Sequence, residues 1–449
     1  MGRLFGTDGA RGVANTELTC ELAMNIGRAA AHVLANNKIG KPKVVIGKDT
    51  RISSSMLENA LTAGLCSVGA DVVLAGYVPT PAIAFLVSDC DADCGIMISA
   101  SHNSFEFNGI KLFSSNGYKL PDAVEEEIEK YVLDDMSAIE LAAPDKMGDV
   151  FIREDYVEKY IDHVCKCVNA DLSGLKIAID CSNGSASVTA EKIFKRLGAD
   201  CYIMSDSPNG ININDNCGST HMERLIHYVN GHDVDLGLAF DGDADRCLAV
   251  DENGEIIDGD KLIAIFSLYL KDIGRLNKNT AVVTVMSNLG FKHFAKANGI
   301  NVAETSVGDR YVLEKMVKEG YVIGGEQSGH IIFKEYATTG DGQLSGAMFA
   351  SIIAKQKIKA SVLADVMHVL PQTMINVKAD KELKAKLNTD KDIIDAIENV
   401  KNDLGDNGRI LVRASGTEPI VRVMLEGTDI STIKKYAKYV AEVIESKGK

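Results

Sequence analysis

The sequence contains no tryptophan, only eight prolines and no long uninterrupted apolar run. Its longest uncharged stretch, residues 72–88, is interrupted by Gly76, Pro79 and Pro81 and is too short to cross a bilayer as a helix. We expect a buried strand and loop there. The N-terminus lacks an apolar signal region, and Gly6 stands where a myristoylation site needs Ser or Thr. These absences predict a cytoplasmic protein with no membrane partner.

Positive charge is also scarce, with 48 Lys and Arg against 63 Asp and Glu and a formal net charge of −15. Such a chain repels nucleic acid, so no nucleic-acid partner is expected, and an anionic substrate requires local clusters of Arg and Lys. The ten cysteines do not show the spacing of a zinc site. We interpret them as reduced thiols.

The order of apolar segments predicts an α/β fold. The length of 449 residues favours three or four domains. A helix, a glycine and a strand follow one another in three places, at residues 56–75, 191–204 and 291–305, which favours three related α/β units. After about residue 370 the pattern changes to that of a small α+β domain, with strands at 373–379, 410–414 and 420–426 and helices at 392–404 and 431–446.

The segment Gly95-Ile-Met-Ile-Ser-Ala-Ser-His-Asn103 runs from an apolar strand into small and polar residues. Open α/β sheets bind ligands at the carboxyl ends of their strands, so Ser101 is expected to stand exposed at such an end. A serine is a poor nucleophile unless a neighbour removes its proton or its oxygen already carries the transferred group. A simple hydrogen-bonded loop is the alternative.

The segment Asp241-Gly-Asp-Ala-Asp-Arg246 follows the apolar strand 236–240. Three carboxylates spaced two residues apart can converge on one hard cation. A calcium EF-hand is a rival, but Arg246 occupies its obligatory glycine position and the flanks read as strands. Mg²⁺ beside a phosphoryl group is the better interpretation, and a solvated acidic turn is the alternative.

Two further turns carry polar groups suited to binding. Arg413-Ala-Ser-Gly-Thr-Glu-Pro lies between two strands and Arg422 follows on the second, which suggests a phosphate site; a surface turn is the alternative. Gly324-Gly-Glu-Gln-Ser-Gly-His330 follows an expected strand at 321–323, where Glu326 and Ser328 could hold a sugar, although an ordinary loop fits equally well.

In this order, the four segments resemble the phosphohexomutase family over essentially the whole chain. Phe5-Gly-Thr-Asp-Gly-Ala-Arg-Gly12 and Gly47-Lys-Asp-Thr-Arg51 match its N-terminal domain. Asn212-Ile-Asn214, Cys217-Gly-Ser-Thr-His221 and Gln327 resemble the branch that acts on glucosamine phosphates. Ser104 departs from the family, which usually has proline there, and leaves the rigidity of the serine loop uncertain.

The resemblance implies three related α/β domains with mixed sheets and a small C-terminal α+β lid around a central cleft. The expected domains are 1–148 with the phosphoserine, 149–249 with the metal site, 250–366 for sugar recognition and 367–449 for phosphate binding. It further implies the following roles: Ser101 as phosphoserine and metal ligand; Asp241, Asp243 and Asp245 as Mg²⁺ ligands; Glu326 and Ser328 on the sugar; Arg413, Ser415, Gly416, Thr417 and Arg422 on the phosphate; Arg246 on the transferred phosphoryl; Lys111 and His330 as acid and base.

The activity implied is interconversion of glucosamine 6-phosphate and glucosamine 1-phosphate through a 1,6-bisphosphate intermediate, which would supply cell-wall precursors. We expect burial beside Mg²⁺ to lower the pKa of Lys111. Mannose or glucose phosphates as substrates, a metal-dependent sugar phosphatase and a non-catalytic sugar-phosphate sensor are the alternatives. The resemblance also suggests a homodimer, although no segment of the sequence identifies the interface.

Overall fold

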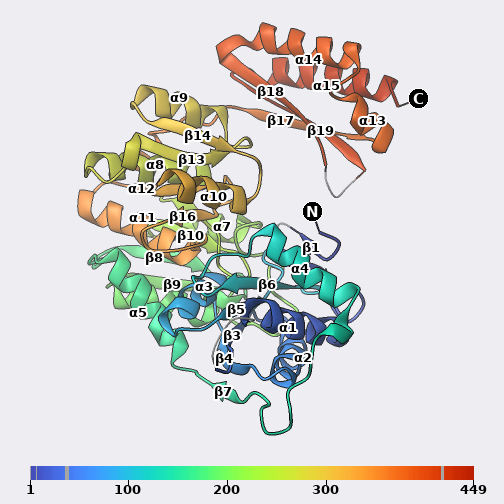
Figure 1. Ribbon diagram of the computed structural model, residues 1–449. Coiled ribbons are helices and arrows are strands. Elements are labelled where there is room, and N and C mark those ends of the chain that lie inside the picture. The colour runs from blue at the N-terminus through green and yellow to red at the C-terminus, as the bar shows by residue number, and fades with distance from the viewer. Residues whose placement is uncertain (1, 7, 36–39, 416–418, 449) are drawn as a thin grey trace. The chain divides into compact units, whose positions relative to one another are not determined.

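The computed structural model describes residues 2–6, 8–35, 40–415 and 419–448. Contacts divide the chain into two units (Figure 1). Unit 1 comprises Met1–Met286 and Ile300–Val366, and unit 2 comprises Ser287–Gly299 and Met367–Lys449.

Unit 1 begins with a seven-stranded mixed sheet, in which the apolar strands at the centre are almost fully buried. Its order is β1 (Phe5–Gly6), β2 (Gly9–Val13), β6 (Phe107–Ser114), β5 (Cys94–Ile98), β3 (Lys43–Lys48), β4 (Asp71–Tyr77) and β7 (Val150–Ile152). Four helices accompany it: α1 (Cys20–Ala35), α2 (Ser54–Ser67), α3 (Thr80–Asp89) and α4 (Asp122–Leu133). The pair α1 and α2 packs its apolar residues into the largest core cluster of this sheet.

Two smaller mixed sheets complete unit 1. The second is ordered β12 (Ile256–Ile257), β11 (Cys247–Asp251), β10 (Leu236–Phe240), β8 (Lys176–Asp180) and β9 (Asp200–Met204), with α5 (Tyr156–Val168), α6 (Ala190–Arg196) and α7 (Glu223–Gly231). The third is ordered β14 (Asn301–Thr305), β13 (Thr280–Thr284), β15 (Ile323–Gly325) and β16 (Ile331–Phe333), with α8 (Gly259–Asp272), α10 (Asp309–Glu319), α11 (Gly342–Gln356) and α12 (Ala360–Ala364).

Unit 2 is built on a three-stranded antiparallel sheet ordered β17 (Gln372–Lys378), β19 (Ile420–Gly427) and β18 (Gly408–Ala414). Its helices are α9 (Leu289–Ala297), α13 (Lys381–Lys386), α14 (Lys391–Leu404) and α15 (Ile430–Ser446). Apolar residues of α14 and α15 pack against the sheet. The segment 287–299 joins this unit because the Asn288 side chain bonds both the carbonyl oxygen and the N–H of Leu370.

The predicted class, three α/β domains with mixed sheets followed by a small α+β domain, is confirmed. The predicted domain limits stay predictions, although β7 pairs with β4 of the first sheet and β11 pairs with β10 of the second. One expectation was wrong: residues 80–88 form helix α3 rather than a loop, because Pro81 lies in the first turn, where no backbone donor is needed. The strand expected at 321–323 lies at Ile323–Gly325.

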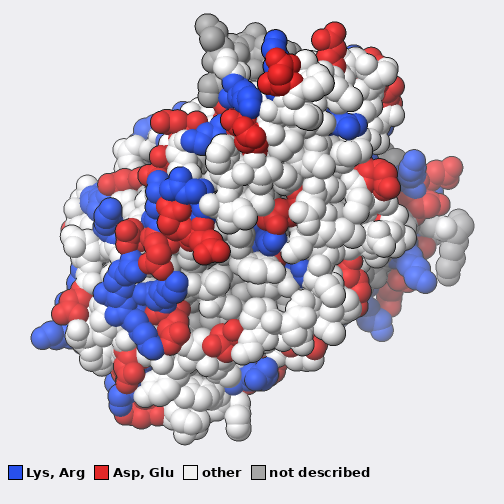
Figure 2. Space-filling view, turned by 90° about the horizontal axis from the view of Figure 1, so that it is seen from below, with Lys and Arg blue, Asp and Glu red and all other residues white. Residues whose placement is uncertain are grey.

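Charged side chains of both signs lie on the surface of the molecule (Figure 2). On the face drawn in Figure 2, Lys and Arg side chains lie among Asp and Glu side chains rather than forming a separate basic patch. No helix in the described ranges has the length and apolar character needed to cross a membrane.

Candidate active site

The serine loop begins where β5 ends, at the carboxyl edge of the first sheet. Ser101 has a φ of 54°, in the left-handed region that is uncommon for a residue other than glycine. Its hydroxyl donates to Asp241 Oδ2 at 2.6 Å. Ser101 is only 1% exposed, so the expectation of an exposed serine was wrong: the turn after β10 covers it.

Two side chains from outside the loop, Arg51 and Asn214, hold its backbone. The guanidinium of Arg51 donates to the carbonyl oxygens of Ser101, Asn103, Ser104 and Phe107. These carbonyl groups therefore have fixed directions, although the proline usual in the family is absent at position 104.

Arg51 is itself held in place, and a second side chain, Asn214, also holds the loop. The buried carboxylate of Asp49 accepts from Arg51 Nε at 2.8 Å and from the Ser54 hydroxyl. Asn214 lies on the loop between β9 and α7. Its Nδ2 donates to the carbonyl oxygens of both Ser101 and Asn103, each at 2.9 Å. The loop is thus held from two domains at once.

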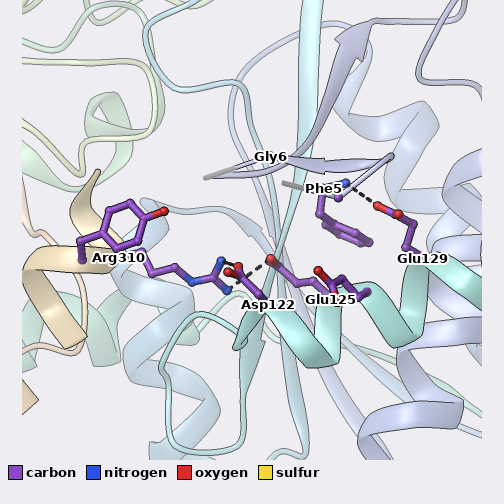
Figure 3. Close-up of a pocket in the computed structure, with 9 residues that line it drawn as sticks. Phe5, Gly6, Asp122, Glu125, Glu129 and Arg310 are labelled. Carbon is purple, nitrogen blue, oxygen red and sulfur yellow. Dashed lines mark hydrogen bonds and ion pairs between the residues drawn. The ribbon is translucent and has the colours of Figure 1, made fainter. Parts of the chain in front are cut away.

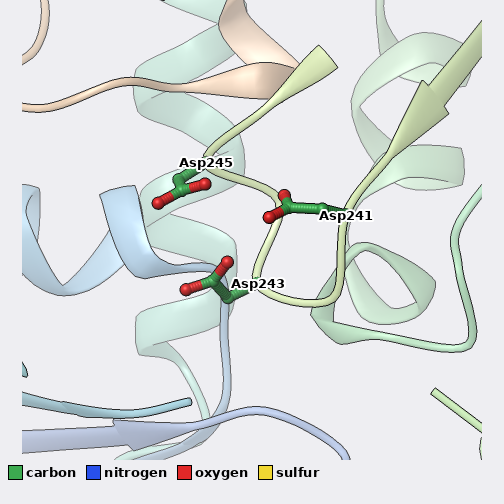
Figure 4. Close-up of side chains that lie close together, drawn as sticks. All are labelled: Asp241, Asp243 and Asp245. Atoms are coloured by element: carbon green, nitrogen blue, oxygen red, sulfur yellow. The ribbon is translucent and has the colours of Figure 1, made fainter. Parts of the chain in front are cut away.

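Asp241, Asp243 and Asp245 face one another from the turn between β10 and β11 (Figure 4). One oxygen from each lies within 4.8 Å of the others, and all three residues are buried. Burial, and then repulsion from Asp245 and Asp243, raises the pKa of Asp241 well above its usual range.

The donor set of these three carboxylates fits a hard divalent cation. Asp243 Oδ1 and Asp245 Oδ1 are buried and have no hydrogen-bond partner among the residues that the structure describes. Unpaired buried carboxylate oxygens are costly unless a cation balances them. The other oxygen of Asp243 is anchored by the Thr80 hydroxyl at 2.5 Å, so the free one is directed toward the other two carboxylates.

Lys111 projects from β6 into this group of carboxylates. Its Nζ lies 2.8 Å from Asp243, 3.4 Å from Asp245 and 3.0 Å from Asp8. Burial alone would lower its pKa, but the carboxylates of Asp243, Asp8 and Asp245 outweigh burial and raise the pKa. The lowered pKa was expected with Mg²⁺ bound, and that cation would offset two of these same carboxylates, so the expectation stays a prediction.

His330 lies on the other side of the triad, with Nδ1 3.6 Å from Asp245 Oδ2. Its Nε2 is 2.9 Å from the backbone N–H of Gly340, which donates to it, and 3.4 Å from Asp309 Oδ2. Burial lowers the pKa of His330, but the Asp245 and Asp309 carboxylates raise it further, so that the net shift is upward. Asp245 stabilises a proton on Nδ1, whereas Nε2 is the nitrogen that accepts from Gly340.

Two cationic or titratable groups flank Ser101. Among the described residues Arg246 Nε has no hydrogen-bond partner; it lies 3.9 Å from Asp245 Oδ1, which leaves the Nε edge of the guanidinium available for an anion. His102 Nδ1 lies 3.4 Å from Ser101 Oγ. Burial, with repulsion from Arg246 and Arg11, lowers the pKa of His102 to about 4, so this ring is neutral near pH 7.

The turn after β15 carries the expected sugar-binding pair. Glu326 accepts from the N–H of Gly308 at 3.1 Å, and the buried Ser328 hydroxyl has no partner in the part of the chain that the structure describes. Gln327, one of the residues that match the glucosamine branch of the family, instead donates to Asp258, the N-cap of α8. Gln327 therefore fixes the shape of the turn.

Unit 2 carries the expected phosphate-binding residues. Arg413 on β18 lies directly opposite Arg422 on β19. Burial, and then repulsion from Arg422, lowers the pKa of Arg413, and an anion bound between them would relieve that repulsion. Lys384 donates to the Ser415 carbonyl at 2.7 Å and adds a third cation. Gly416 and Thr417 lie outside the described residues.

Several residues near the site had no role assigned from the sequence. Lys119 is buried between Asp8 and Asp309, and Asp8 also pairs with Arg11. Arg51 and Asn214 hold the serine loop, as described above. The sequence did single out the motifs that contain these residues, namely the two N-terminal motifs and Asn212-Ile-Asn214. Their contact partners lie far away in the sequence, so residue spacing could not predict which segments meet.

Family models match nearly the whole chain in the order of its sheets. Phosphoglucomutase/phosphomannomutase alpha/beta/alpha domains I, II and III match residues 2–138, 158–254 and 258–370, and the C-terminal domain of that family matches residues 374–443. The chain belongs to the phosphoglucomutase/phosphomannomutase family.

Within that family, the relatives it resembles carry a narrower name. It is 51% identical to the phosphoglucosamine mutase of Acetivibrio thermocellus over 447 residues and 52% identical to that of Clostridium acetobutylicum over 449, with 100% of each chain covered.

Solved structures agree on the fold. A phosphoglucomutase/phosphomannomutase family protein from Burkholderia thailandensis matches with a TM-score of 0.84 at 24% identity, covering 100% of this chain and 99% of that one. The N-acetylphosphoglucosamine mutase of Aspergillus fumigatus, solved with GlcNAc-6P and magnesium, matches with a TM-score of 0.73 at 18% identity, covering 100% and 96%.

Proposed function

We propose that this protein is a phosphoglucosamine mutase that interconverts glucosamine 6-phosphate and glucosamine 1-phosphate through a phosphorylated Ser101. The observation that carries the proposal is the hydrogen bond from the Ser101 hydroxyl to Asp241. It places the nucleophile beside three buried carboxylates that could bind a metal ion. The full-length identity to phosphoglucosamine mutases supports the choice of sugar.

The reaction runs in two phosphoryl transfers. In the first, the P–O bond of phosphoserine 101 breaks and a new one forms to the free sugar hydroxyl, which loses its proton while Ser101 gains one. In the second, the bisphosphate presents its other phosphate to Ser101 and the same bond changes run in reverse. The products are the isomeric monophosphate and a re-phosphorylated serine, so that no water is consumed.

Asp241, Asp243 and Asp245 would hold Mg²⁺ together with the phosphate on Ser101. The ion supplies charge neutralisation to the transferring phosphoryl group. Arg246 acts on the same group, since its unpartnered Nε leaves a guanidinium edge for phosphoryl oxygens.

Proton transfer falls to His330 and Lys111. His330 accepts from the Gly340 N–H at Nε2, so its other nitrogen, Nδ1, 3.6 Å from Asp245 Oδ2, is the one that can hold a proton and return it. Lys111 lies on the strand after the serine loop and remains a cation, because carboxylates surround it. Its raised pKa makes Lys111 a weak acid, so we assign it chiefly as a counter-ion to the phosphate; it would protonate a departing oxygen only if bound Mg²⁺ and phosphate lowered that pKa.

Binding of the sugar monophosphate is divided between two turns. Glu326 and the free hydroxyl of Ser328 hydrogen-bond the sugar. Arg413, Arg422 and Ser415, with Gly416 and Thr417, bind the phosphate that is not being transferred. The free 1,6-bisphosphate also serves as activator, because it restores the phosphate of a serine that has lost it.

The chemistry and cysteine content indicate the cellular setting. The ten cysteines are all free thiols, as expected in a reducing cytosol. There the glucosamine 1-phosphate product would enter the synthesis of amino-sugar nucleotides for the cell wall.

A substrate panel tests this proposal. Glucosamine, glucose, mannose and N-acetylglucosamine 1-phosphates are compared by kcat/KM with Mg²⁺ and a trace of bisphosphate. We expect glucosamine 1-phosphate to lead by about tenfold, equivalent to about 1.4 kcal/mol of transition-state binding. A lead by glucose or mannose phosphate would contradict the sugar assignment, and steady release of inorganic phosphate would favour a phosphatase.

A further inference from the structure

Arg310, in the first turn of α10, reaches from the third domain of the chain to the first. Its guanidinium donates to the carbonyl oxygen of Leu120 and to the carboxylate of Asp122. Its Nη2 also donates to Glu125 Oε2 at 3.3 Å (Figure 3). These partners belong to one short segment at the start of α4, so a single side chain joins two domains.

The contacts of Arg310 are shielded from water. The residue is 9% exposed, and the side chain of Glu125 is 11% exposed. A buried guanidinium keeps its charge and needs acceptors for its donors, and its planar fork can serve several acceptors at once. The single ammonium group of lysine, on a flexible stem, cannot reproduce this arrangement. The three contacts therefore favour arginine at this position.

The two residues that precede Arg310 contact the candidate active site. The Gly308 N–H donates to Glu326 Oε1 at 3.1 Å. Asp309 Oδ2 lies 3.4 Å from His330 Nε2. Because the three residues are consecutive, the bonds that fix Arg310 also restrict where Gly308 and Asp309 can lie.

Arg310 itself lies outside the candidate active site. It lines a separate cavity of about 50 Å³ with residues of the N-terminal segment and of α4, none of which has a role in the site. A cavity of this size has room for one or two water molecules but not for a sugar phosphate. Any effect of Arg310 on a substrate must therefore pass through the residues that it holds.

We propose that Arg310 is a positioning residue for sugar binding. By holding the start of α10 to the first domain, it fixes the Gly308 N–H, which in turn directs the Glu326 carboxylate toward the sugar. Ser101 belongs to the same first domain, so the sugar is held at a defined place relative to the serine that transfers the phosphate. This inference rests on the proposed function, which assigns the sugar to Glu326.

Calorimetry on the full chain tests this role. The variant is Arg310→Met, because methionine keeps a flexible apolar side chain and removes every donor. We expect the dissociation constant for glucosamine 1-phosphate to rise by at least about tenfold, while that for Mg²⁺ stays within about twofold of the wild type. A general loss of stability would instead weaken the binding of both.

Two further variants complete the calorimetry. Arg310→Lys keeps a positive charge beside the two carboxylates and should recover part of the sugar affinity. The matched control is Arg275→Met, which removes an arginine that pairs with Glu335 and Tyr336 inside the third domain, and both dissociation constants should stay unchanged. Equal sugar affinity in Arg310→Met and Arg275→Met, or an equal loss of sugar and Mg²⁺ binding in Arg310→Met, overturns the proposal.

Amide hydrogen exchange tests the positioning step without any substrate. In Arg310→Met the amide of Gly308, which is bonded to Glu326, should exchange at least about tenfold faster than in the wild type, whereas the amides of the serine loop keep their rates. An unchanged rate at Gly308 overturns the proposal even where sugar binding is weaker. A wild type that binds hexose phosphates without interconverting them would contradict the proposed function, and the exchange rates would still decide the role of Arg310.

Discussion

The side-chain amide of Asn214 donates a 2.9 Å hydrogen bond to the backbone carbonyl of Ser101, which lies 113 residues earlier in the chain. The same amide nitrogen reaches the carbonyl of Asn103 at 2.9 Å. The second domain therefore supplies both groups: the turn after β10 carries the carboxylate that contacts the serine hydroxyl, and the loop between β9 and α7 carries the amide that holds the serine backbone. The position of Ser101 and the negative charge beside its hydroxyl therefore both depend on contacts between the first and second domains.

Replacement of Asn214 by alanine should slow turnover without weakening substrate binding. The variant loses two hydrogen bonds of about 0.5–1.5 kcal/mol each, which corresponds to a fall in kcat of about tenfold with KM nearly unchanged. The control is Asn212→Ala, because the bonds of the Asn212 side chain to described residues stay within its own loop. Equal kcat values for the two variants would contradict a positioning role for Asn214.

Arg51→Ala should destabilise the fold strongly. The change leaves the Asp49 carboxylate buried without its cation and releases the carbonyl oxygens of the serine loop. Loss of one partner from a buried ion pair typically costs about 3–5 kcal/mol, which urea unfolding measures directly. Arg196, paired with Glu158 and Asp162 on the surface, is the control, and its replacement should change the unfolding midpoint little. Similar midpoints for both variants would argue against Arg51 as the holding group.

Asp243→Asn should weaken divalent-cation binding while preserving shape. It removes the charge of a carboxylate whose Oδ1 has no partner in the described structure. We expect titration calorimetry with Mg²⁺ or Mn²⁺ to show affinity lower by at least about tenfold, equivalent to about 1.4 kcal/mol. Asp251→Asn, a buried carboxylate on β11 that accepts from the N–H groups of its own turn, is the control. Unchanged affinity in Asp243→Asn means that the triad is structural.

Glu125 lines a cavity between α4 and α10 (Figure 3). Its titration predicts that the stability of the fold depends on pH. Burial raises the pKa of Glu125 to about 7, against the opposing charge of Arg310 and with added repulsion from Asp122. The folded state therefore holds a proton that the unfolded state releases above about pH 4.5, so stability falls as pH rises toward 7.

Glu125→Gln should flatten that fall, because the amide does not titrate. The readout is the free energy of unfolding at a series of pH values between 4.5 and 7. The exposed neighbour Glu126 provides the control, and Glu126→Gln should keep the slope of the wild type. A wild-type slope in Glu125→Gln would assign the dependence to another group.

The sequence predicted the parts of the site that follow apolar strands. Ser101 and Asp241 each come shortly after a buried strand, and the carboxyl edge of a sheet is where ligands bind. It did not predict that Ser101 is buried, nor that Arg51 and Asn214 meet its carbonyl oxygen, because these contacts join segments 50 and 113 residues apart. Helix α3 was missed because its apolar residues gave no helical alternation: seven of its ten residues are buried.

The central claim is that the phosphate on Ser101 passes to a sugar hydroxyl rather than to water. Protein carrying a radiolabelled phosphate on Ser101, confirmed by peptide mapping, is mixed with unlabelled glucosamine 6-phosphate in a single turnover, with Ser101→Ala as the unlabelled control. We predict that the label leaves Ser101 and appears first in a hexosamine 1,6-bisphosphate, then in the monophosphate pool. Label found in inorganic phosphate, retained on the protein or mapped to another residue would contradict the account.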